Sequence, residues 1–205
     1  ASLIDAADSN LPSDFGALSQ REFLEVADVE RAAAAFIERG ATALGPKWRN
    51  PDGLEASVLR DPGGAIVAVA KPPAHVRNVA NAPDVSWYAL NTSDVQRAKE
   101  NYAELFGWHF RAPLELGEYG VFFPFAWKAD EPPVGVLGGI EQRPGVHPHW
   151  LFHFDVPALE PALAAVRAAG GNVLAPITLP SGERIAVCED AQGAAFALHE
   201  SIIPR

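Results

Sequence analysis

Apolar residues recur every three to four positions in three stretches of the chain. This spacing places the apolar side chains of each stretch on one face of an α-helix. The three stripes are Val29, Ala32, Phe36 and Ile37; Val95, Ala98, Tyr102, Leu105 and Phe106; and Leu159, Ala162, Leu163 and Val166. The pattern therefore predicts three helices, each packed by one face on a sheet. Gly40, Gly107 and Gly170 stand where these helices would end.

Apolar stretches bounded by turn residues surround each predicted helix. Short apolar runs precede the helices, and stretches such as "EYGVFFPFAW" (118–127) and "ITLPSGERIAVCED" (177–190) follow them. Such stretches are typical of β-strands. Each unit thus reads as a strand, a helix and three strands. The predicted fold class is α+β, built from repeated β-α-β-β-β units.

The first and third units repeat one another in sequence. "DVERAAAAFIERGATALGP" (28–46) aligns without a gap on "ALEPALAAVRAAGGNVLAP" (158–176). "LRDPGGAIVAVA" (59–70) aligns in the same way on "CEDAQGAAFALH" (188–199). A related but distinct middle unit opens with "VSWYALNTSDVQRAKENYAELFGW" (85–108). This self-similarity indicates that one supersecondary unit is used three times.

The units predict one complete and one incomplete module. Residues 84–143 and 147–203 form a complete pair, whereas residues 22–73 match only the second member of a pair. The predicted domains are 1–73, an incomplete module; 74–83, a linker rich in Pro and Asn; and 84–205, a complete module. About 50 residues would precede the strand-like N-terminal segment in a complete first module. The chain contains no Met, which agrees with residues upstream.

Composition and charge exclude several classes of function. A chain of 205 residues with 48% apolar residues can bury a sizeable core. A net charge of −10 with only 16 basic residues argues against nucleic acid or an anionic membrane as a partner. The single cysteine, Cys188, allows neither an intrachain disulfide nor a cysteine zinc site. No apolar run has the length of a membrane span or the pattern of a signal peptide, so we expect a cytoplasmic protein.

Several of these motifs resemble the vicinal oxygen chelate superfamily, which holds glyoxalase I, extradiol dioxygenases and bleomycin-resistance proteins. They are "NYAELFGW" (101–108), the paired "LRDPGGAIVAVA" and "CEDAQGAAFALHE" endings, and the "PHWLFHFDV" strand (148–156). The resemblance covers nearly the whole chain. It implies that two β-α-β-β-β units wrap their sheets into an open barrel around one cavity. It does not imply one activity, because this fold hosts isomerases, dioxygenases, lyases and binding proteins.

The resemblance also implies where metal ligands would stand. Metal-binding members carry His or Glu seven residues before the helix-opening Asp, and Glu seven residues after the turn Asp. These positions hold Trp87, Leu151 and Ala197, and the fourth lies in the apolar stretch "VGVLGGIE" (134–141). In the N-terminal copy they hold Arg21 and Ala68. Because divalent metals need several N, O or S donors at one point, we expect neither the family metal nor another cofactor.

Strand alternation suggests a different set of cavity residues. His149, Leu151 and His153 share one face of their strand, and Trp150, Phe152 and Phe154 share the other, which should meet a helix. His149, His153 and His199 could therefore converge, to bind a ligand, to move protons, or to hold a metal. Alternatively, His149 and His153 are hydrogen-bonded lining residues and His199 lies at an exposed strand end. The predicted ligand-binding residues are Trp87, Ala89, Asn91, His149, Leu151, His153, Ala197 and His199, with His149 and His153 as candidate catalytic residues.

Aromatic residues and the cysteine each allow two interpretations. The aromatic residues of the middle unit could stack a planar ligand or form core; they are Trp87, Tyr88, Phe122, Phe123, Phe125 and Trp127. Cys188 lies in an apolar strand, which favours a structural thiol over a nucleophile.

Three functions remain open. The first is a metal-free protein that binds a small, hydrophobic or aromatic molecule in the 84–203 barrel. The second is a lyase, isomerase or hydroxylase-like enzyme that uses the cavity histidines, with or without a metal. The third is a role in assembly. Residues 22–73 form half a barrel whose strands carry apolar residues such as Val58, Ile66 and Val67, so a homodimer through this half-module is a further expectation.

Overall fold

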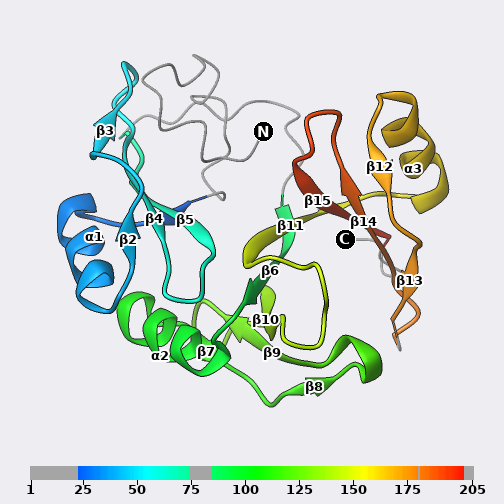
Figure 1. Ribbon diagram of the computed structural model, residues 1–205, viewed down its shortest axis with the longest axis horizontal. Helices are drawn as coiled ribbons and strands as arrows, with labels where there is room; N and C mark the ends of the chain where they lie inside the picture. Colours follow the sequence, from blue (N-terminus) through cyan, green and yellow to red (C-terminus); the bar gives the residue numbers. More distant parts are fainter. Residues whose placement is uncertain (1–22, 74–84, 180, 201–205) are drawn as a thin grey trace. The chain divides into compact units, whose positions relative to one another are not determined.

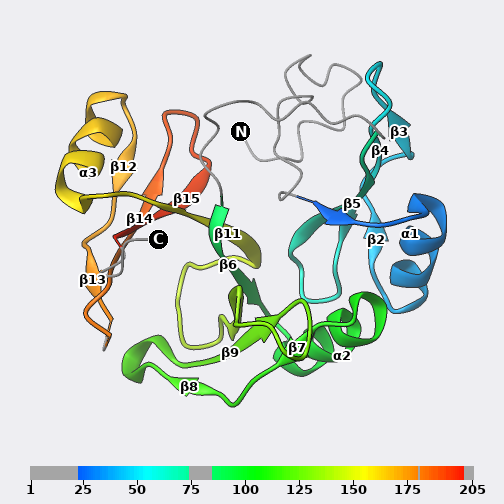
Figure 2. The ribbon, with the colours of Figure 1, turned by 180° about the vertical axis from the view of Figure 1, so that it is seen from behind.

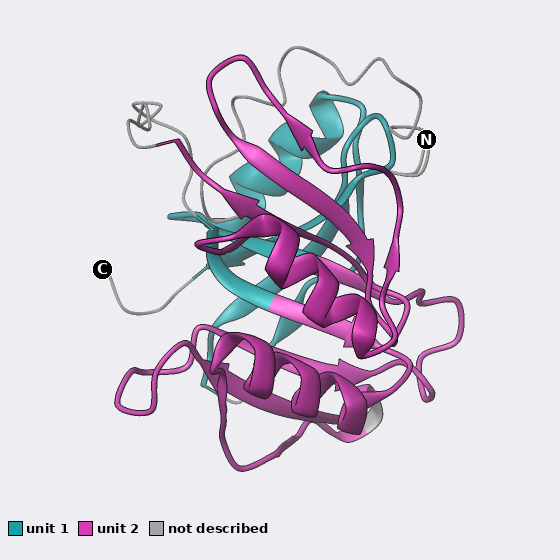
Figure 3. Cartoon of the chain, turned by 90° about the vertical axis from the view of Figure 1, so that its left-hand side faces the viewer, with its two compact units in different colours: residues 1–6, 83–88, 151–205 teal, residues 7–82, 89–150 magenta. Residues whose placement is uncertain are grey.

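The computed structural model describes residues 23–73, 85–179 and 181–200. The predicted linker, residues 74–83, lies outside them. Contacts divide the chain into two compact units (Figure 3). The described residues of unit 1 are 85–88, 151–179 and 181–200, and those of unit 2 are 23–73 and 89–150. The strands β6 (Val85–Thr92) and β11 (His149–Asp155) contribute residues to both units, and the predicted domain boundaries stay predictions.

Each repeat contains a strand, a helix and four further strands (Figure 1). The first repeat comprises β1 (Leu24–Glu25), α1 (Val29–Glu38), β2 (Thr42–Ala43), β3 (Trp48–Arg49), β4 (Glu55–Arg60) and β5 (Ile66–Lys71). The second comprises β6, α2 (Val95–Phe106), β7 (His109–Phe110), β8 (Leu114–Glu115), the 3-10 turn η3 (Gly117–Tyr119), β9 (Val121–Ala126) and β10 (Gly135–Gly139). The third comprises β11, α3 (Leu159–Ala168), β12 (Asn172–Val173), β13 (Ile177–Thr178), β14 (Arg184–Glu189) and β15 (Ala195–Glu200). The predicted α+β class is confirmed.

The first strand after each helix is broken into two short strands, which differs from the predicted unit. In every repeat both pieces pair antiparallel with the same long strand: β2 and β3 with β4, β7 and β8 with β9, and β12 and β13 with β14. A proline stands in each break, namely Pro46, Pro113 and Pro176. Because proline has no N–H to donate to the ladder, it interrupts the pairing.

The helices begin and end close to the predicted signals. Asp28 and Asp94 each accept the backbone N–H three residues later at 3.0 Å and so cap α1 and α2. Ala158 has no such side chain, and Glu200 of β15 instead accepts the Leu159 N–H at 2.9 Å. The predicted C-terminal glycines all have positive φ, although Gly107 alone is the C-cap residue itself.

The first repeat forms its own sheet in unit 2, in the order β1-β5-β4-β2, with α1 on one face. The predicted α1 stripe is partly wrong: Val29, Ala33 and Phe36 are buried, whereas Ile37 is 45% exposed. Val67 pairs with Leu59 on the face that meets α1. Val58, Ile66 and Val67 were predicted on the face without a helix. Only Val58 and Ile66 lie there, and both are half-buried.

Within unit 2, hydrogen bonds join the 61–65 turn of the first repeat to helix α2 and to Ser93 just before it in the second repeat. The buried Tyr102 hydroxyl of α2 donates to Asp61 Oδ2 at 3.0 Å, and Asp61 Oδ1 accepts the Ala65 N–H. Burial raises the pKa of the Asp61 carboxyl, a shift that the hydrogen bond from Tyr102 opposes. Nearby, the Ser93 hydroxyl donates to the Gly63 carbonyl at 2.9 Å. A buried polar contact thus joins two sequence repeats.

Aromatic side chains form the core between α2 and the second sheet of unit 2. That sheet has the order β6-β10-β9-β7. Tyr102 stacks on Trp108 with ring centres 4.6 Å apart, and Trp108 stacks on Phe125 at 4.4 Å. Trp150 meets Tyr102 edge-on at 5.8 Å. Trp150 thus lies on the helix side of β11, as alternation predicts.

In the sheet of unit 1, the strands of the third repeat pair in the order β12-β14-β15-β11, and β6 of the second repeat lies next to β11. Helix α3 covers one face of this sheet, as Figure 2 shows from behind. Leu159 and Leu163 of α3 pack on Leu198, with Phe154 and Phe196 around them. The strand residues between these, such as His153 and Ala197, must therefore face away from α3.

None of the helices among the described residues is long and apolar enough to cross a lipid bilayer.

Candidate functional site

A group of polar side chains lies on the face of unit 1 that points away from α3. The parallel pairing of β11 and β15 aligns His153 with Ala197 and Asp155 with His199. Leu151 shares this face, because side chains two residues apart point to the same side of a strand. We call His153, Asp155, Glu183 and His199 the histidine cluster.

His153 is buried without a hydrogen-bond partner. The residue is 6% exposed, and neither ring nitrogen makes a hydrogen bond. Its backbone is held, since the Ser86 hydroxyl donates to the His153 carbonyl at 3.1 Å. Burial lowers the pKa of His153 to about 4, and the nearby His199 adds to this effect while Asp155 opposes it. The imidazole is therefore neutral near pH 7, with one donor and one acceptor nitrogen unused.

His199 lies between two carboxylates. Its Nδ1 is 3.2 Å from Asp155 Oδ1, and its Nε2 is 3.8 Å from Glu183 Oε2. Neither contact is directed well enough to count as a hydrogen bond, so both are electrostatic contacts. The structure thus brings together His153 and His199, as predicted from alternation, and adds two acidic neighbours.

The predicted site residues Ala89, Asn91 and His149 belong to unit 2. His149 Nδ1 donates to the His147 carbonyl at 2.6 Å, and its Nε2 lies 3.2 Å from the buried Asn91 amide nitrogen. A neutral ring protonated at Nδ1 satisfies both contacts, because Nε2 then accepts from Asn91. His149 is therefore a partnered side chain, unlike His153.

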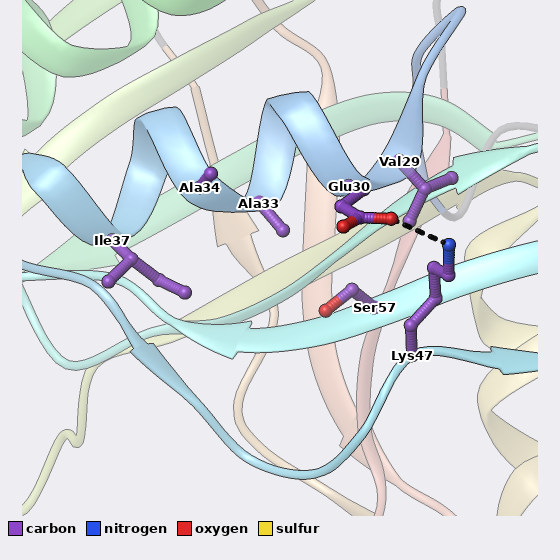
Figure 4. A pocket seen from close by; sticks show the side chains of 7 residues that line it. All are labelled: Val29, Glu30, Ala33, Ala34, Ile37, Lys47 and Ser57. Carbon is purple, nitrogen blue, oxygen red and sulfur yellow. Dashed lines mark hydrogen bonds and ion pairs between the residues drawn. The ribbon is translucent and has the colours of Figure 1, made fainter.

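The surface carries two open hollows of about 380 Å³ each. The first lies in unit 2 between α1 and β4, and an exposed Glu30–Lys47 ion pair of 3.1 Å crosses it (Figure 4). The second lies in unit 1 beside the end of α3. None of the predicted ligand-binding residues lines either hollow.

Five of the six candidate stacking residues already contact another aromatic ring or a cation. Phe125 is fully buried against Trp108, and Trp127 meets both rings. Tyr88 meets Phe152 edge-on at 6.1 Å on the side of β6 opposite Trp87. Two cations cover the remaining rings, Lys99 over Phe123 and Arg143 over Phe122. Trp87 therefore points to the other side of β6, on the same face as the histidine cluster, and remains a candidate for stacking on a ligand.

Cys188 lies under α3 in the core of unit 1 and is 1% exposed. Burial raises the pKa of its thiol. A protonated, inaccessible thiol is a poor nucleophile, which supports the structural interpretation.

Sequence comparison places the chain in a family. Residues 84–198 match the Glyoxalase/Bleomycin resistance protein/Dioxygenase superfamily. The chain belongs to this superfamily. A relative from Mycobacterium tuberculosis (strain CDC 1551 / Oshkosh), named "Putative glyoxylase CFP32", is 30% identical over 182 residues, which are 86% of this chain and 67% of the relative. An equally similar relative of the same name comes from Mycobacterium bovis.

Solved structures of the superfamily share the fold at low sequence identity. The 2,3-dioxygenase LapB from Pseudomonas sp. KL28 is 14% identical with a TM-score of 0.56, over 88% of this chain and 71% of that one. The Mn(II)-bound glyoxalase from Novosphingobium aromaticivorans is 12% identical with a TM-score of 0.57, over 86% of this chain and 60% of that one. At these identities the likeness concerns the fold alone.

The residues present do not fit the superfamily's metal site. Trp87, Leu151 and Ala197 offer no carboxylate or imidazole at the expected ligand positions, and neither does Ala68; Arg21 lies outside the described residues. Among the residues that the structure describes, no group of three or more His, Cys, Asp and Glu side chains could hold a metal ion. That the protein is free of metal stays a prediction.

Sequence reasoning missed Asp155 and Glu183. Asp155 could have been found, because it lies two residues after His153 on the same strand face. Glu183 lies before β14 and reaches His199 only through the β14–β15 pairing. No local pattern in the sequence marks it.

Proposed function

We propose that the protein binds a small, hydrophobic or aromatic molecule on the histidine-cluster face of the predicted 84–205 module, without the superfamily's metal. The observation that carries this proposal is the buried His153 imidazole with two unused nitrogens. Leaving a buried polar group without a partner costs about 1–3 kcal/mol, so such groups are rare and call for an explanation. A ligand that hydrogen-bonds to His153 is the explanation that we favour.

The surroundings of His153 favour a ligand with apolar surface. Leu151 and Ala197 are buried on the same face, and Trp87 shares it by alternation. Binding sites for small molecules typically combine apolar walls with a few placed polar groups. This combination supports a ligand that is largely hydrophobic and carries at least one polar atom.

The side chains at the expected metal-ligand positions lack metal-binding atoms, which supports binding without the metal. Trp87, Leu151 and Ala197 can contact an apolar ligand but cannot coordinate an ion. The Novosphingobium glyoxalase is described as Mn(II)-bound, and that description applies to that protein only. For this chain we propose that the ligand contacts the strands directly.

Proton transfer by the cavity histidines, with or without a metal, is the second candidate function, in a lyase, isomerase or hydroxylase-like reaction. The contact between His199 and Asp155 favours it, since a carboxylate beside an imidazole is a recurring arrangement for moving protons. The depressed pKa of His153 weakens it, because a neutral imidazole with a pKa of about 4 is a weak base. We therefore place binding first.

Native mass spectrometry and elemental analysis of the purified protein test the proposal. We expect a retained small molecule, or a mass shift on incubation with a panel of aromatic compounds, and less than stoichiometric divalent metal. His153→Ala should abolish binding, whereas the exposed His109→Ala is the matched control and should bind normally. About one metal ion per chain that is lost in a His149→Ala/His153→Ala variant would contradict the metal-free proposal. Binding that is unchanged in His153→Ala would contradict the proposed site.

A further inference from the structure

Helix α2 and the residues just before it cover one end of the first repeat within unit 2. The Tyr102 and Ser93 hydroxyls donate to the 61–65 turn, and the Arg97 guanidinium donates to the Arg39 carbonyl at the end of α1 at 3.0 Å. Each of these side chains of the second repeat is a donor, and each partner in the first repeat is an acceptor. The first repeat thus offers α2 a surface of acceptors.

Aromatic rings complete this contact. Phe36 of α1 meets Tyr102 and Phe106 of α2 edge-on, in each case with ring centres 5.7 Å apart. Phe36 is fully buried, and Asp61 in the turn is 4% exposed. The end of α1 and the turn therefore form a docking surface for a helix, and α2 occupies it.

The third repeat carries the same surface. Helices α1 and α3 are each 10 residues long, and the sequence alignment pairs them residue for residue, as it pairs the turns that follow β4 and β14. The counterparts of Phe36, Arg39, Asp61 and Gly63 are Val166, Ala169, Asp190 and Gln192. All four counterparts line the second hollow, whose volume is about 380 Å³. The hollow of unit 1 is therefore the counterpart of the surface that α2 covers in unit 2.

This surface is open in the third repeat. Val166 is half-buried and Asp190 is exposed, whereas their counterparts in the first repeat are buried. Asp190 Oδ1 accepts two backbone N–H groups of its own turn at 2.8 Å each. Its second oxygen corresponds to the Asp61 oxygen that accepts from Tyr102, and it contacts no residue that the structure describes. A carboxylate oxygen beside the hollow can thus accept from a partner.

We propose that the hollow of unit 1 docks an amphipathic helix of another protein. The helix that fits it carries an aromatic ring to pack on Val166 and Phe196. It also carries a hydroxyl to donate to Asp190 and a second donor for the Ala169 carbonyl, because hydrogen bonds to a carboxylate are strong and this surface supplies only acceptors. Helix α2 of a second copy is not available, since the first repeat of its own chain holds it. The hollow lies on the helix side of the sheet and His153 on the other, so this inference is independent of the proposed function.

The probe is a synthetic peptide of residues 92–107, which we call the α2 peptide. A Gln96→Lys change allows a lactam bond to Glu100, which locks the peptide as a helix. These two residues are exposed, and their side chains are hydrogen-bonded at 2.7 Å, so the lactam stays clear of the docking side. A second peptide differs only by Tyr102→Phe and lacks the hydroxyl. Fluorescein at the C-terminus of each peptide allows fluorescence anisotropy to measure its binding to the full chain.

We expect the α2 peptide to bind saturably, and the Tyr102→Phe peptide to bind about fivefold more weakly. In the protein, Asp190→Asn keeps Oδ1 for the turn and replaces the second oxygen by a donor amide. This variant should bind the α2 peptide about fivefold more weakly and the Tyr102→Phe peptide without change, because the two groups act as a pair. Equal weakening of both peptides, or no saturable binding, would overturn the proposal.

An Ala191→Arg variant tests the location, since Ala191 is exposed and lines the hollow. The long cationic side chain fills the hollow and should abolish binding of the α2 peptide. Ala164→Arg is the matched control and should bind normally, because Ala164 is exposed on α3 but does not line the hollow. Binding that survives Ala191→Arg contradicts the location. If light scattering shows that Ala191→Arg alone dissociates a wild-type dimer, the occupant is a second copy of this chain and the proposal is wrong.

Discussion

His153 is held in an environment that keeps its imidazole neutral. The folded ring has a pKa of about 4, compared with the ordinary value of 6.5. Between these two values the unfolded chain binds a proton that the folded chain does not, so acidification through this range favours unfolding. A difference of this size corresponds to about 3 kcal/mol of stability lost between about pH 7 and pH 4.

Replacing the buried imidazole in a His153→Leu variant should change both the stability and its dependence on pH. Near pH 7 the variant should be more stable by about 1 kcal/mol, because leucine removes an unpaired buried polar group. Its free energy of unfolding should also fall less on acidification. Urea denaturation at several pH values measures both effects. An equal loss of stability in both proteins between about pH 7 and pH 4 would show that His153 does not titrate as argued.

The hydrogen bond from the Tyr102 hydroxyl to Asp61 can be tested by mutation. This hydroxyl is the side-chain partner of the buried Asp61 carboxyl. We expect Tyr102→Phe to lower the free energy of unfolding by about 1–3 kcal/mol, because the carboxyl loses a hydrogen bond without gaining water. The exposed Tyr119→Phe serves as the control and should have little effect. Equal stability of the two variants in denaturant titrations would count against this role of Tyr102.

At the scale of the elements, the helices were largely predictable and the strands less so. The stripe of α2 and its glycine cap followed directly from residue spacing. In α1 the run of alanines left the stripe ambiguous, because alanine fits both faces; hence Ile37 was wrongly placed in the core. The divided strand after each helix was missed, although the proline in each break was visible in the sequence.

Only those residues of the candidate site whose placement follows from side-chain alternation along a strand could be predicted from the sequence. Alternation assigns His153 to the cavity-facing side of its strand and His199 to the cavity-facing side of another. The acidic neighbours depend on the pairing of β11 with β15 and of β14 with β15. Register between distant strands is set by packing of the whole sheet, which local spacing does not reveal.

Helix α3 offers a prediction at the element scale. Its N-terminus lacks a local cap at Ala158 and borrows the carboxylate of Glu200 from β15. Glu200→Ala should therefore destabilise the protein by about 1 kcal/mol, as loss of a helix cap does. Adding Ala158→Ser should restore much of this loss by supplying a local acceptor. Thermal unfolding monitored by circular dichroism measures both; a double variant no more stable than Glu200→Ala would contradict the borrowed cap.

At the scale of the whole molecule, the first repeat leads us to propose self-association. Its sheet carries α1 on one face, and Val58 and Ile66 are half-buried on the other. At about 25 cal/mol per Å², each 100 Å² of apolar surface left uncovered costs about 2.5 kcal/mol. The proposed cover is the same face of a second copy, since two-fold pairing of identical surfaces is the common form of dimer.

Light scattering coupled to size exclusion tests this assembly, together with the intact mass of the same sample. We expect a dimer that dissociates in Val58→Asp, whereas Ile37→Asp on the α1 side should leave it intact. A wild-type monomer at micromolar concentration, in a sample whose intact mass equals that of the 205 residues, would rule the dimer out.

The reaction of Cys188 with a thiol reagent can report local opening of unit 1. Cys188 is the only cysteine in the sequence, and it lies beneath α3 in the core of unit 1. A thiol reagent can reach it only when that core opens, so the rate of labelling measures how often unit 1 exposes its interior. Ligands that bind unit 1 should slow the labelling in proportion to their occupancy. The protein thus carries an intrinsic kinetic readout of binding that needs no engineered probe.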